Sequence, residues 1–449
     1  MYQKKSFYKV VWGIVLPVTL QSLLQSSFGV VDQVMTGQLG SVSIAGIGLG
    51  TKFTSIFSVL VSAVAAAAGI MIAQYAGKRE EQSVSRSFWV NLVLVLVLAA
   101  FFIAACLAFP RKIMEFYTGD ENTGNLAAGY LRIVSLSFLP GAVTALVSTL
   151  LRCMDEAALP LYASLFGAVV NTGLNYVLIF GRWGFPELGV TGAALATVCS
   201  QSAGCVLLLL LFLGRYRSQA WKLSPVFRFD KGGRIQYMGI LLPILACEFF
   251  WSLGENVYAV IYGHIGTESC AAMTLTGPVQ VLFMGMLSGL SQAAGILTGK
   301  TLGREEYDRA CEEAGKLMKC GLWVSGVLSV LLILCSRYYV GMYRVSQQVK
   351  ELAWQIMAVF ALIAPVKVQN MILGGGILRS GGKTGYVMTV DFIGTWLFGV
   401  PLGLLAAFVW NLSIPWVYFI LSLEECVRLL ISVFIFRSRR WMGSLPGTI

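Results

Sequence analysis

The sequence has 449 residues, of which 57% are hydrophobic and 12% are charged. A soluble globular domain carries about 25% charged residues, so this composition excludes an ordinary soluble protein and indicates an integral membrane protein. The formal net charge of +11 falls mainly in the loops between apolar blocks. That placement argues against a nucleic-acid partner and for a role of the charge in membrane topology.

Apolar blocks follow one another along the chain, and they are long enough to cross a hydrocarbon core about 30 Å thick as helices. We predict an all-α membrane protein with twelve spans, at residues 10–36, 44–76, 88–109, 126–150, 158–180, 189–213, 236–262, 270–298, 313–336, 351–378, 385–409 and 413–436. The first block is too long for a signal peptide, and no small-residue cleavage site follows it. We therefore expect it to remain as the first span.

The first half of the chain recurs in the second half. Residues 16–80 are repeated 226 positions later (243 − 17 = 226). The matching pairs are Leu16-Pro17 with Leu242-Pro243, Gly37 with Gly263, Gly40 with Gly266, Ser62 with Ser288, Gly77 with Gly303 and Glu80 with Glu306; at an offset of 227, Leu151-Arg152 matches Leu378-Arg379. Spaced Gly, Pro and Glu residues do not coincide in one register by chance, so the chain contains two copies of one unit.

This duplication predicts two lobes of six helices each. Residues 1–213 form the N-lobe, 214–235 a cytoplasmic linker and 236–449 the C-lobe. Because six is an even number, both copies enter the membrane in the same orientation. A pseudo-twofold axis along the membrane normal therefore relates the two lobes.

Basic residues concentrate in alternate loops and at both ends of the chain, including Lys4, Lys5, Arg439 and Arg440. The positive-inside rule places such loops in the cytoplasm. We therefore predict a multi-pass protein of the inner (plasma) membrane with both termini in the cytoplasm, and we expect it to be a monomer.

Charged residues inside the predicted spans are candidates for function, because each costs about 2.5–3.5 kcal/mol on insertion scales. The candidates are Asp32, Lys52, Glu248, Glu255, Lys367, Asp391, Glu424, Glu425 and Arg428. Glu248 lies near the middle of its span, and Glu255 lies two turns on along nearly the same face. A carboxylate at that depth pairs with a basic group, binds a cation or holds a proton. Lys367 is the expected partner of Glu248 if the first of these applies.

Asp32 forms a second candidate site with amide side chains. Asn171 and Asn175 lie one turn apart on one face of the predicted fifth span. Their neutral oxygens are suited to share a cation with Asp32, although each Asn alone is more often a helix–helix hydrogen bond. Lys52 is a candidate ion-pair partner of Asp32, and Asp32 is also near enough to the end of its span to reach the interface.

Motifs of soluble sites are absent from the sequence. The ten cysteines form no Cys-x-x-Cys pattern, and His264 is the only histidine, so metal and disulfide sites are not expected. The sequence also lacks a complete phosphate-binding loop and any Gly-x-Ser-x-Gly or His-Glu-x-x-His motif. We predict no cofactor and no enzymatic activity, and transport would draw on an ion gradient.

Several segments resemble the multidrug and toxic compound extrusion (MATE) transporters, over nearly the whole chain. They are Leu16-Pro17 with Asp32–Gly37, Asn171–Tyr176, Gly192–Thr197, Glu248–Gly254 and Gly376–Gly382. The resemblance implies two six-helix lobes that alternate access, and export of amphipathic, often cationic compounds against inward H⁺ or Na⁺. It also implies a coupling site in the N-lobe at Asp32, Asn171, Asn175 and Thr197, and a coupling acid in the C-lobe at Glu248.

Two departures from the family pattern favour protons. The second helix 5 position is an aspartate in some relatives and is Asn175 here. Lys367 lies near the place where sodium-type members carry a helix 10 acid, and it would repel a cation. Lys52, Lys367 and Asp391 are expected to support or neutralise the coupling acids.

We therefore predict a secondary antiporter that exports an organic cation in exchange for H⁺ or Na⁺, with the lipid bilayer and a small organic substrate as its partners. Phe28, Trp251 and Tyr258 are candidates for contact with that cation. A flippase for lipid-linked precursors, which shares the wider superfamily architecture, is the alternative. An intramembrane enzyme is a distant third, because no nucleophile–base pair or metal-ligand set is evident.

Overall fold

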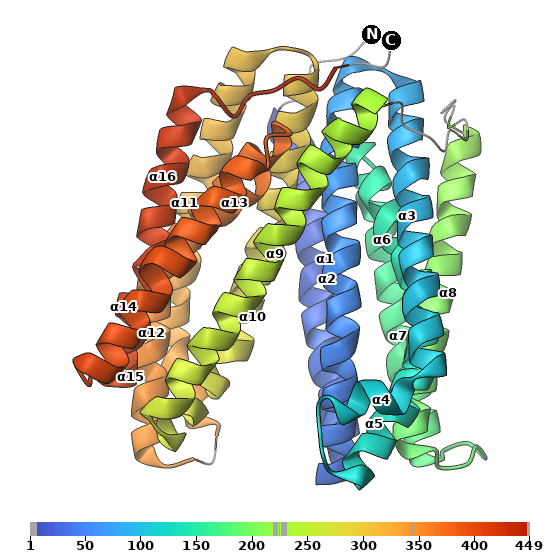
Figure 1. The fold of residues 1–449 in the computed structure, drawn as a ribbon, viewed down its shortest axis with the longest axis vertical. Coiled ribbons are helices and arrows are strands. Elements are labelled where there is room, and N and C mark those ends of the chain that lie inside the picture. Colours follow the sequence, from blue (N-terminus) through green and yellow to red (C-terminus); the bar gives the residue numbers. More distant parts are fainter. Residues whose placement is uncertain (1–6, 219–222, 224, 226–230, 344, 447–449) are drawn as a thin grey trace.

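The computed structural model describes residues 7–218, 223, 225, 231–343 and 345–446, and its regular elements in these ranges are helices (Figure 1). Residues 219–222, 224 and 226–230 of the predicted linker 214–235 lie outside the described residues. Lys4 and Lys5, which contribute to the predicted topology, also lie outside them. The placement of the linker and the cytoplasmic location of the termini stay predictions.

The N-lobe contains the first eight helices. They are α1 (Phe7–Thr36), α2 (Ser41–Lys78), α3 (Glu81–Ala108), α4 (Pro110–Glu115), α5 (Glu121–Val134), α6 (Phe138–Cys153), α7 (Ala158–Phe180) and α8 (Gly189–Ser218), with short turns at η1 (Gly37–Leu39) and η2 (Ser135–Ser137). The turn η2 joins α5 and α6 into one continuous span.

The C-lobe repeats this order with more interruptions. Its elements are α9 (Lys231–Ile265), α10 (Thr267–Gly303), α11 (Tyr307–Gly341), α12 (Gln347–Asn370), η3 (Met371–Leu378), α13 (Gly385–Phe392), η4 (Ile393–Gly399), α14 (Val400–Leu404), η5 (Leu405–Val409), α15 (Ile414–Ser422) and α16 (Glu424–Ser438). The segments η3, η4 and η5 are π-helical turns. Such turns widen a helix locally and often occur at functional sites.

The prediction of twelve spans is confirmed. Eleven helical segments among the described residues are long and apolar enough to cross a membrane. The twelfth consists of α15 and α16, which run on from each other through Leu423, whose backbone is helical. Neither half is long enough alone, and Glu424, Glu425 and Arg428 lower the apolar character of the combined segment.

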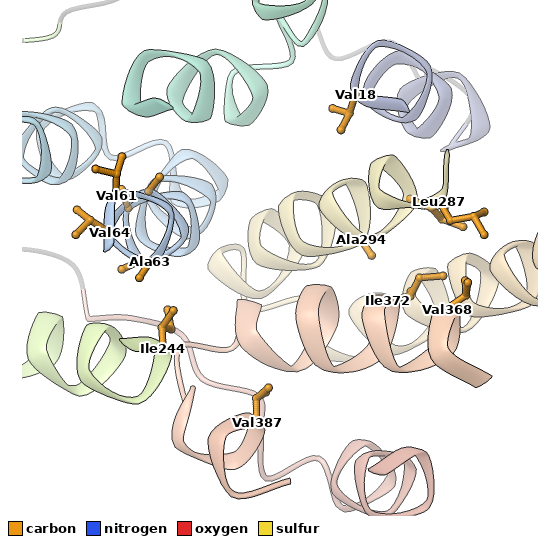
Figure 2. Close-up of a cluster of buried hydrophobic side chains, with 14 of the residues drawn as sticks. Val18, Val61, Ala63, Val64, Ile244, Leu287, Ala294, Val368, Ile372 and Val387 are labelled. Carbon is orange, nitrogen blue, oxygen red and sulfur yellow. The ribbon is translucent and has the colours of Figure 1, made fainter. Parts of the chain in front are cut away.

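One buried apolar cluster joins the two lobes. Figure 2 shows Val18 of α1 and Val61 of α2 in the same cluster as Ile244 of α9, Leu287 of α10 and Val387 of α13. Small residues on α2 and α10 let these helices approach closely. The central helices of the two lobes therefore share a core along part of their length.

Polar contacts join the lobes only from the middle of the bundle to the end where both termini lie (Figure 1). The side-chain hydrogen bonds include Thr19 to the Met286 carbonyl (3.0 Å), Ser22 with Ser288 (2.9 Å), Tyr237 to Asn91 (2.7 Å), Arg152 to Gln292 (2.8 Å) and Lys300 to Asp155 (2.8 Å). The described residues form no such bond between the lobes in the other half. The lobes are thus closed together at the end that carries the termini.

Candidate functional site

The acid predicted in the N-lobe lies beside the predicted amides. Asp32 lies on α1, four residues before the end of the helix, and its Oδ1 accepts a hydrogen bond from Asn175 Nδ2 (2.6 Å). The same Nδ2 donates to Asn171 Oδ1 (3.2 Å), because the two amides are one turn apart on α7. The helical spacing read from the sequence therefore brings Asp32, Asn171 and Asn175 together.

Ser200, which was not predicted from the sequence, extends this cluster to α8. Asn171 Nδ2 donates to Ser200 Oγ (3.3 Å), and Ser200 donates to the Thr197 carbonyl (3.0 Å). The Thr197 hydroxyl itself donates to the Ala193 carbonyl (3.0 Å). Thr197 is therefore linked to the cluster through its backbone, and its side chain makes no hydrogen bond to Asp32 in this structure.

No basic residue in the described part of the chain lies within ion-pair distance of Asp32. Lys52, the predicted candidate partner of Asp32, is exposed and forms no ion pair with the described residues. Asn175 is fully buried, and its Oδ1 has no hydrogen-bond partner among the described residues. A buried amide oxygen without a donor costs free energy. The N-lobe thus holds a carboxylate and an unsatisfied oxygen side by side with no basic group to neutralise them.

The C-lobe contains a cavity of about 520 Å³ between α9, α10, α12, α13 and the final span. Its ionisable lining consists of the acids Glu255, Asp391, Glu424 and Glu425, the bases Lys367, Arg379 and Arg428, and the tyrosines Tyr258, Tyr262 and Tyr418. Trp251 and Tyr258, predicted as substrate contacts, also line this cavity. Phe28 does not line it.

Glu248 is held by a different partner from the one predicted. Arg379 Nη1 lies 3.6 Å from Glu248 Oε1, whereas Lys367 Nζ lies 3.9 Å from Glu425 Oε1. The pairing of Lys367 with Glu248 is therefore wrong, because Lys367 on α12 faces α16 and Glu248 on α9 faces the end of η3. Glu248 also does not line the cavity, although Glu255 two turns on does.

Two of the four acids of this cavity, Asp391 and Glu425, are neutralised within the protein. Arg428 forms ion pairs with Asp391 and with Glu425 (Nη1 to Oε2, 3.6 Å), and Lys367 is the second partner of Glu425. Asn370 Nδ2 also donates to Glu425 Oε2 (2.8 Å). These contacts satisfy Asp391 and Glu425 and hold the last span against α12 and α13.

Glu255 and Glu424 are the acids of the cavity without a basic partner among the described residues. Glu424 Oε2 accepts a hydrogen bond from the Tyr258 hydroxyl (2.5 Å). Glu255 makes no hydrogen bond or ion pair within the described ranges, and it is exposed to the cavity. Both acids were predicted as charged residues inside spans, but only Glu255 was assigned to cation coupling.

Comparison with known proteins identifies the chain. The sequence model of the MatE family matches residues 17–177 and 243–405, one match in each copy of the repeat. The chain belongs to the MatE family. Both MatE matches begin at a proline, 226 residues apart (243 − 17 = 226), which is the offset found in the sequence. The resemblance to multidrug and toxic compound extrusion transporters and the duplication are thereby confirmed.

The relatives of this MatE chain match nearly its full length. It is 22% identical over 446 residues to "Uncharacterized transporter YisQ" of Bacillus subtilis (97% of this chain, 95% of that protein). It is 26% identical over 453 residues to "Probable multidrug resistance protein NorM" of Rhizobium meliloti (96% and 94%). The solved structure "Crystal structure of MATE in the straight conformation" has the same fold, with a TM-score of 0.88, 17% identity and 96% coverage of both chains. The MatE chain is therefore a multi-pass membrane transporter.

Proposed function

We propose that this transporter exports a small organic cation in exchange for an inward-moving proton, and that Asp32 is the residue that carries the proton. The observation behind the proposal is the isolation of Asp32. It is a carboxylate inside a span, its nearest polar partner is an amide, and no basic residue of the described chain lies within 4 Å of it. An acid in a membrane span without a counter-charge is costly, which marks Asp32 as a candidate functional site.

The groups around Asp32 favour a proton over sodium. A hard metal cation takes several oxygen ligands, whereas the group facing Asp32 is the N–H donor of Asn175. The amide oxygen of Asn175 is unsatisfied, so an amide flip would present that oxygen to a protonated Asp32. The Asn175 amide can thus offer its N–H to the ionised carboxylate and its oxygen to the protonated acid.

We assign the organic cation to the cavity of the C-lobe. Its volume of about 520 Å³ falls within the range of small-molecule sites, about 300–1,000 Å³. Glu255 and Glu424 supply negative charge without an internal basic partner, and Trp251 and Tyr258 supply aromatic faces for an ammonium group. The lining has four acids and three bases, which is opposite to the strongly basic cavity that a flippase for lipid-linked phosphates would need.

Transport in proteoliposomes tests this proposal. Ethidium efflux is measured with a pH gradient and a sodium gradient imposed separately, for the wild type, Asp32→Asn and Glu255→Gln. We expect the pH gradient alone to drive efflux in the wild type, and Asp32→Asn to lose this efflux. Glu255→Gln is expected to weaken ethidium binding.

Glu115→Gln is the matched control, because Glu115 is an exposed carboxylate at the end of α4. Its efflux should equal that of the wild type. Wild-type efflux from Asp32→Asn, with equal amounts of protein in the vesicles, would overturn the assignment of Asp32. Efflux driven by the sodium gradient alone would overturn proton coupling.

A further inference from the structure

The last described residues cross from one lobe to the other. We call residues 439–446 the C-terminal strap. It follows α16 of the C-lobe and runs across the end of the molecule that carries the termini, toward α2 of the N-lobe (Figure 1). The strap therefore lies over the region where the lobes are closed together.

The strap is anchored to the C-lobe by apolar packing and by charge. Trp441 is fully buried and stacks on Phe436, with ring centroids 5.7 Å apart. Gly381 makes room for it, because a Cβ at Gly381 would lie 2.1 Å from the Trp441 carbonyl oxygen. Arg439 pairs with Asp308 of α11 (2.8 Å). Removing Trp441 from this site would expose a large apolar surface, so the anchor is strong.

The contacts of the strap with the N-lobe are polar instead. The buried Gln74 side chain of α2 donates to the carbonyl of Gly443 (3.1 Å) and accepts from the backbone N–H of Leu445 (2.8 Å). Lys78 Nζ donates to the Leu445 carbonyl (2.6 Å), and the Tyr75 hydroxyl donates to the Pro446 carbonyl (3.4 Å). Gln74 also donates to the Ser380 carbonyl of the C-lobe (2.6 Å).

The strap lies over the tightest crossing between the lobes. A Cβ at Gly77 of α2 would lie 2.1 Å from the Lys300 carbonyl oxygen, and a Cβ at Gly303 of α10 would lie 2.0 Å from the Gln74 carbonyl oxygen. Both relations are equivalent under the repeat (303 − 77 = 226; 300 − 74 = 226). The crossing is therefore symmetric, but the strap bonds to Gln74 and not to its counterpart Lys300, which pairs with Asp155.

We propose that the C-terminal strap is a latch between the lobes. It stabilises the state in which the lobes are closed at the end carrying the termini, and its release from Gln74, Tyr75 and Lys78 accompanies their separation there. The inference rests on the alternating access contained in the proposed function, but not on the coupling ion or the substrate.

The strap is held on α2 by hydrogen bonds and on the C-lobe by a buried tryptophan, and this difference determines from which lobe it is released. Hydrogen bonds to Gln74, Tyr75 and Lys78 are replaced by bonds to water when the lobes part, so each shifts the equilibrium only about two- to tenfold. The buried Trp441 has no such replacement in water. The strap therefore leaves α2 and stays on the C-lobe.

Distances between the lobes test the latch directly. Spin labels are introduced through unnatural amino acids at Gln82 of α3 and Lys319 of α11, two exposed positions in the two lobes. Pulsed electron paramagnetic resonance then gives the distance distribution of the full chain in lipid nanodiscs, without substrate or gradient. Gln74→Leu should raise the population with longer distances about tenfold or more, because it removes the two strap bonds and the bond to Ser380.

Lys78→Met removes one bond and should give a smaller rise of about two- to fivefold, and it decides the question if Gln74→Leu does not fold. Lys383→Met is the matched control, because Lys383 bonds the strap at the Arg440 carbonyl (2.8 Å) within the C-lobe; its distribution should equal that of the wild type. A wild-type distribution in both Gln74→Leu and Lys78→Met would overturn the latch. The distances report the latch even if the efflux experiment rejects Asp32 as the proton carrier.

Discussion

The two lobes carry the same arginine in different surroundings. Arg152 in the N-lobe and Arg379 in the C-lobe are equivalent under the repeat (379 − 152 = 227). Arg152 Nη2 donates to Gln21 Oε1 (2.8 Å), and Gln21 Nε2 donates to Ser164 Oγ (2.6 Å). In the N-lobe the arginine is therefore embedded in a chain of neutral groups from α1 and α7.

The C-lobe builds the same chain from an acid and a thiol. Arg379 Nη2 donates to Cys247 Sγ (3.2 Å), and that thiol donates to Asp391 Oδ2 (2.7 Å). Cys247 and Asp391 occupy the places of the glutamine and the serine of the N-lobe (247 − 21 = 226; 391 − 164 = 227). Glu248, the neighbour of Cys247, adds a second carboxylate to this arginine.

The two copies therefore share the position of the arginine but differ in the charge of its partners. The C-lobe balances its bases with acids inside the protein. The N-lobe keeps its arginine among neutral groups and leaves Asp32 without a basic partner in the described chain. A change of protonation at Asp32 is therefore not compensated by a neighbouring base, as it would be at Asp391.

The largest loss of stability is expected when a base that neutralises the acids of the C-lobe is removed. Arg428→Met leaves Asp391 and Glu425 without this partner, and removal of one member of a buried ion pair costs about 3–5 kcal/mol. Both carboxylates are largely buried, with side chains 15% and 11% exposed. Thermal unfolding in detergent measures the loss. Arg437→Met on the same helix is the control, since Arg437 is exposed; equal stability of the two variants would contradict a balanced network.

A smaller and symmetric effect is expected at the crossing of α2 and α10. Gly77→Ala and Gly303→Ala each force a Cβ against a carbonyl oxygen of the other helix, and overpacking of this kind costs about 1–3 kcal/mol. Unfolding midpoints of both variants should fall by similar amounts. Gly315→Ala, where a Cβ meets open space, is the control. A large loss in one variant and none in the other would refute the symmetry of the crossing.

The two equivalent arginines should respond unequally to the same change. Arg379→Met removes the basic partner of Glu248, and an unsatisfied charged group costs about 1–3 kcal/mol or more. Arg152→Met leaves only amide oxygens without a donor, and it should cost about 1 kcal/mol. Denaturant unfolding of the two variants in parallel measures this difference. If Arg152→Met destabilised the protein more than Arg379→Met, the charge of the hydrogen-bond partners would not determine how much each arginine contributes to stability.

The smallest expected effect concerns the choice between protons and sodium as the coupling ion. Asn175→Asp places a second carboxylate beside Asp32 and removes the N–H donor that faces it. Two acids with no base nearby suit a metal cation better than one, so sodium should stimulate efflux of this variant about two- to fivefold. Efflux in proteoliposomes with and without a sodium gradient measures the change. Asn256→Asp on exposed α9 surface is the control and should show no sodium response.

The sequence predicted the parts of this molecule that depend on periodicity and on the cost of burial. Hydropathy located the spans, the 226-residue offset revealed the two copies, and helical spacing brought Asn171 and Asn175 to Asp32. These features follow from local geometry and from the membrane as a solvent, so no knowledge of the tertiary structure was required.

The partners of the C-lobe acids depend instead on how distant helices rotate against one another. Arg379 follows the π-helical turn η3 and lies 131 residues from Glu248 (379 − 248 = 131), so its pairing left no signal in spacing. The ion pair of Lys367 with Glu425 likewise depends on how α12 and α16 pack, which residue spacing does not predict. The strap carried no signal either, because its contacts with Gln74 involve backbone groups of residues 443 and 445.

Proton release on substrate binding tests the role of Asp32 most directly. Ethidium is added to purified protein in weakly buffered solution, and a pH indicator reports the protons released. If Asp32 holds the proton that the organic cation displaces, the wild type releases protons and Asp32→Asn, with ethidium still bound, releases none. Equal proton release from both proteins would contradict Asp32 as the site where the inward-moving ion is carried.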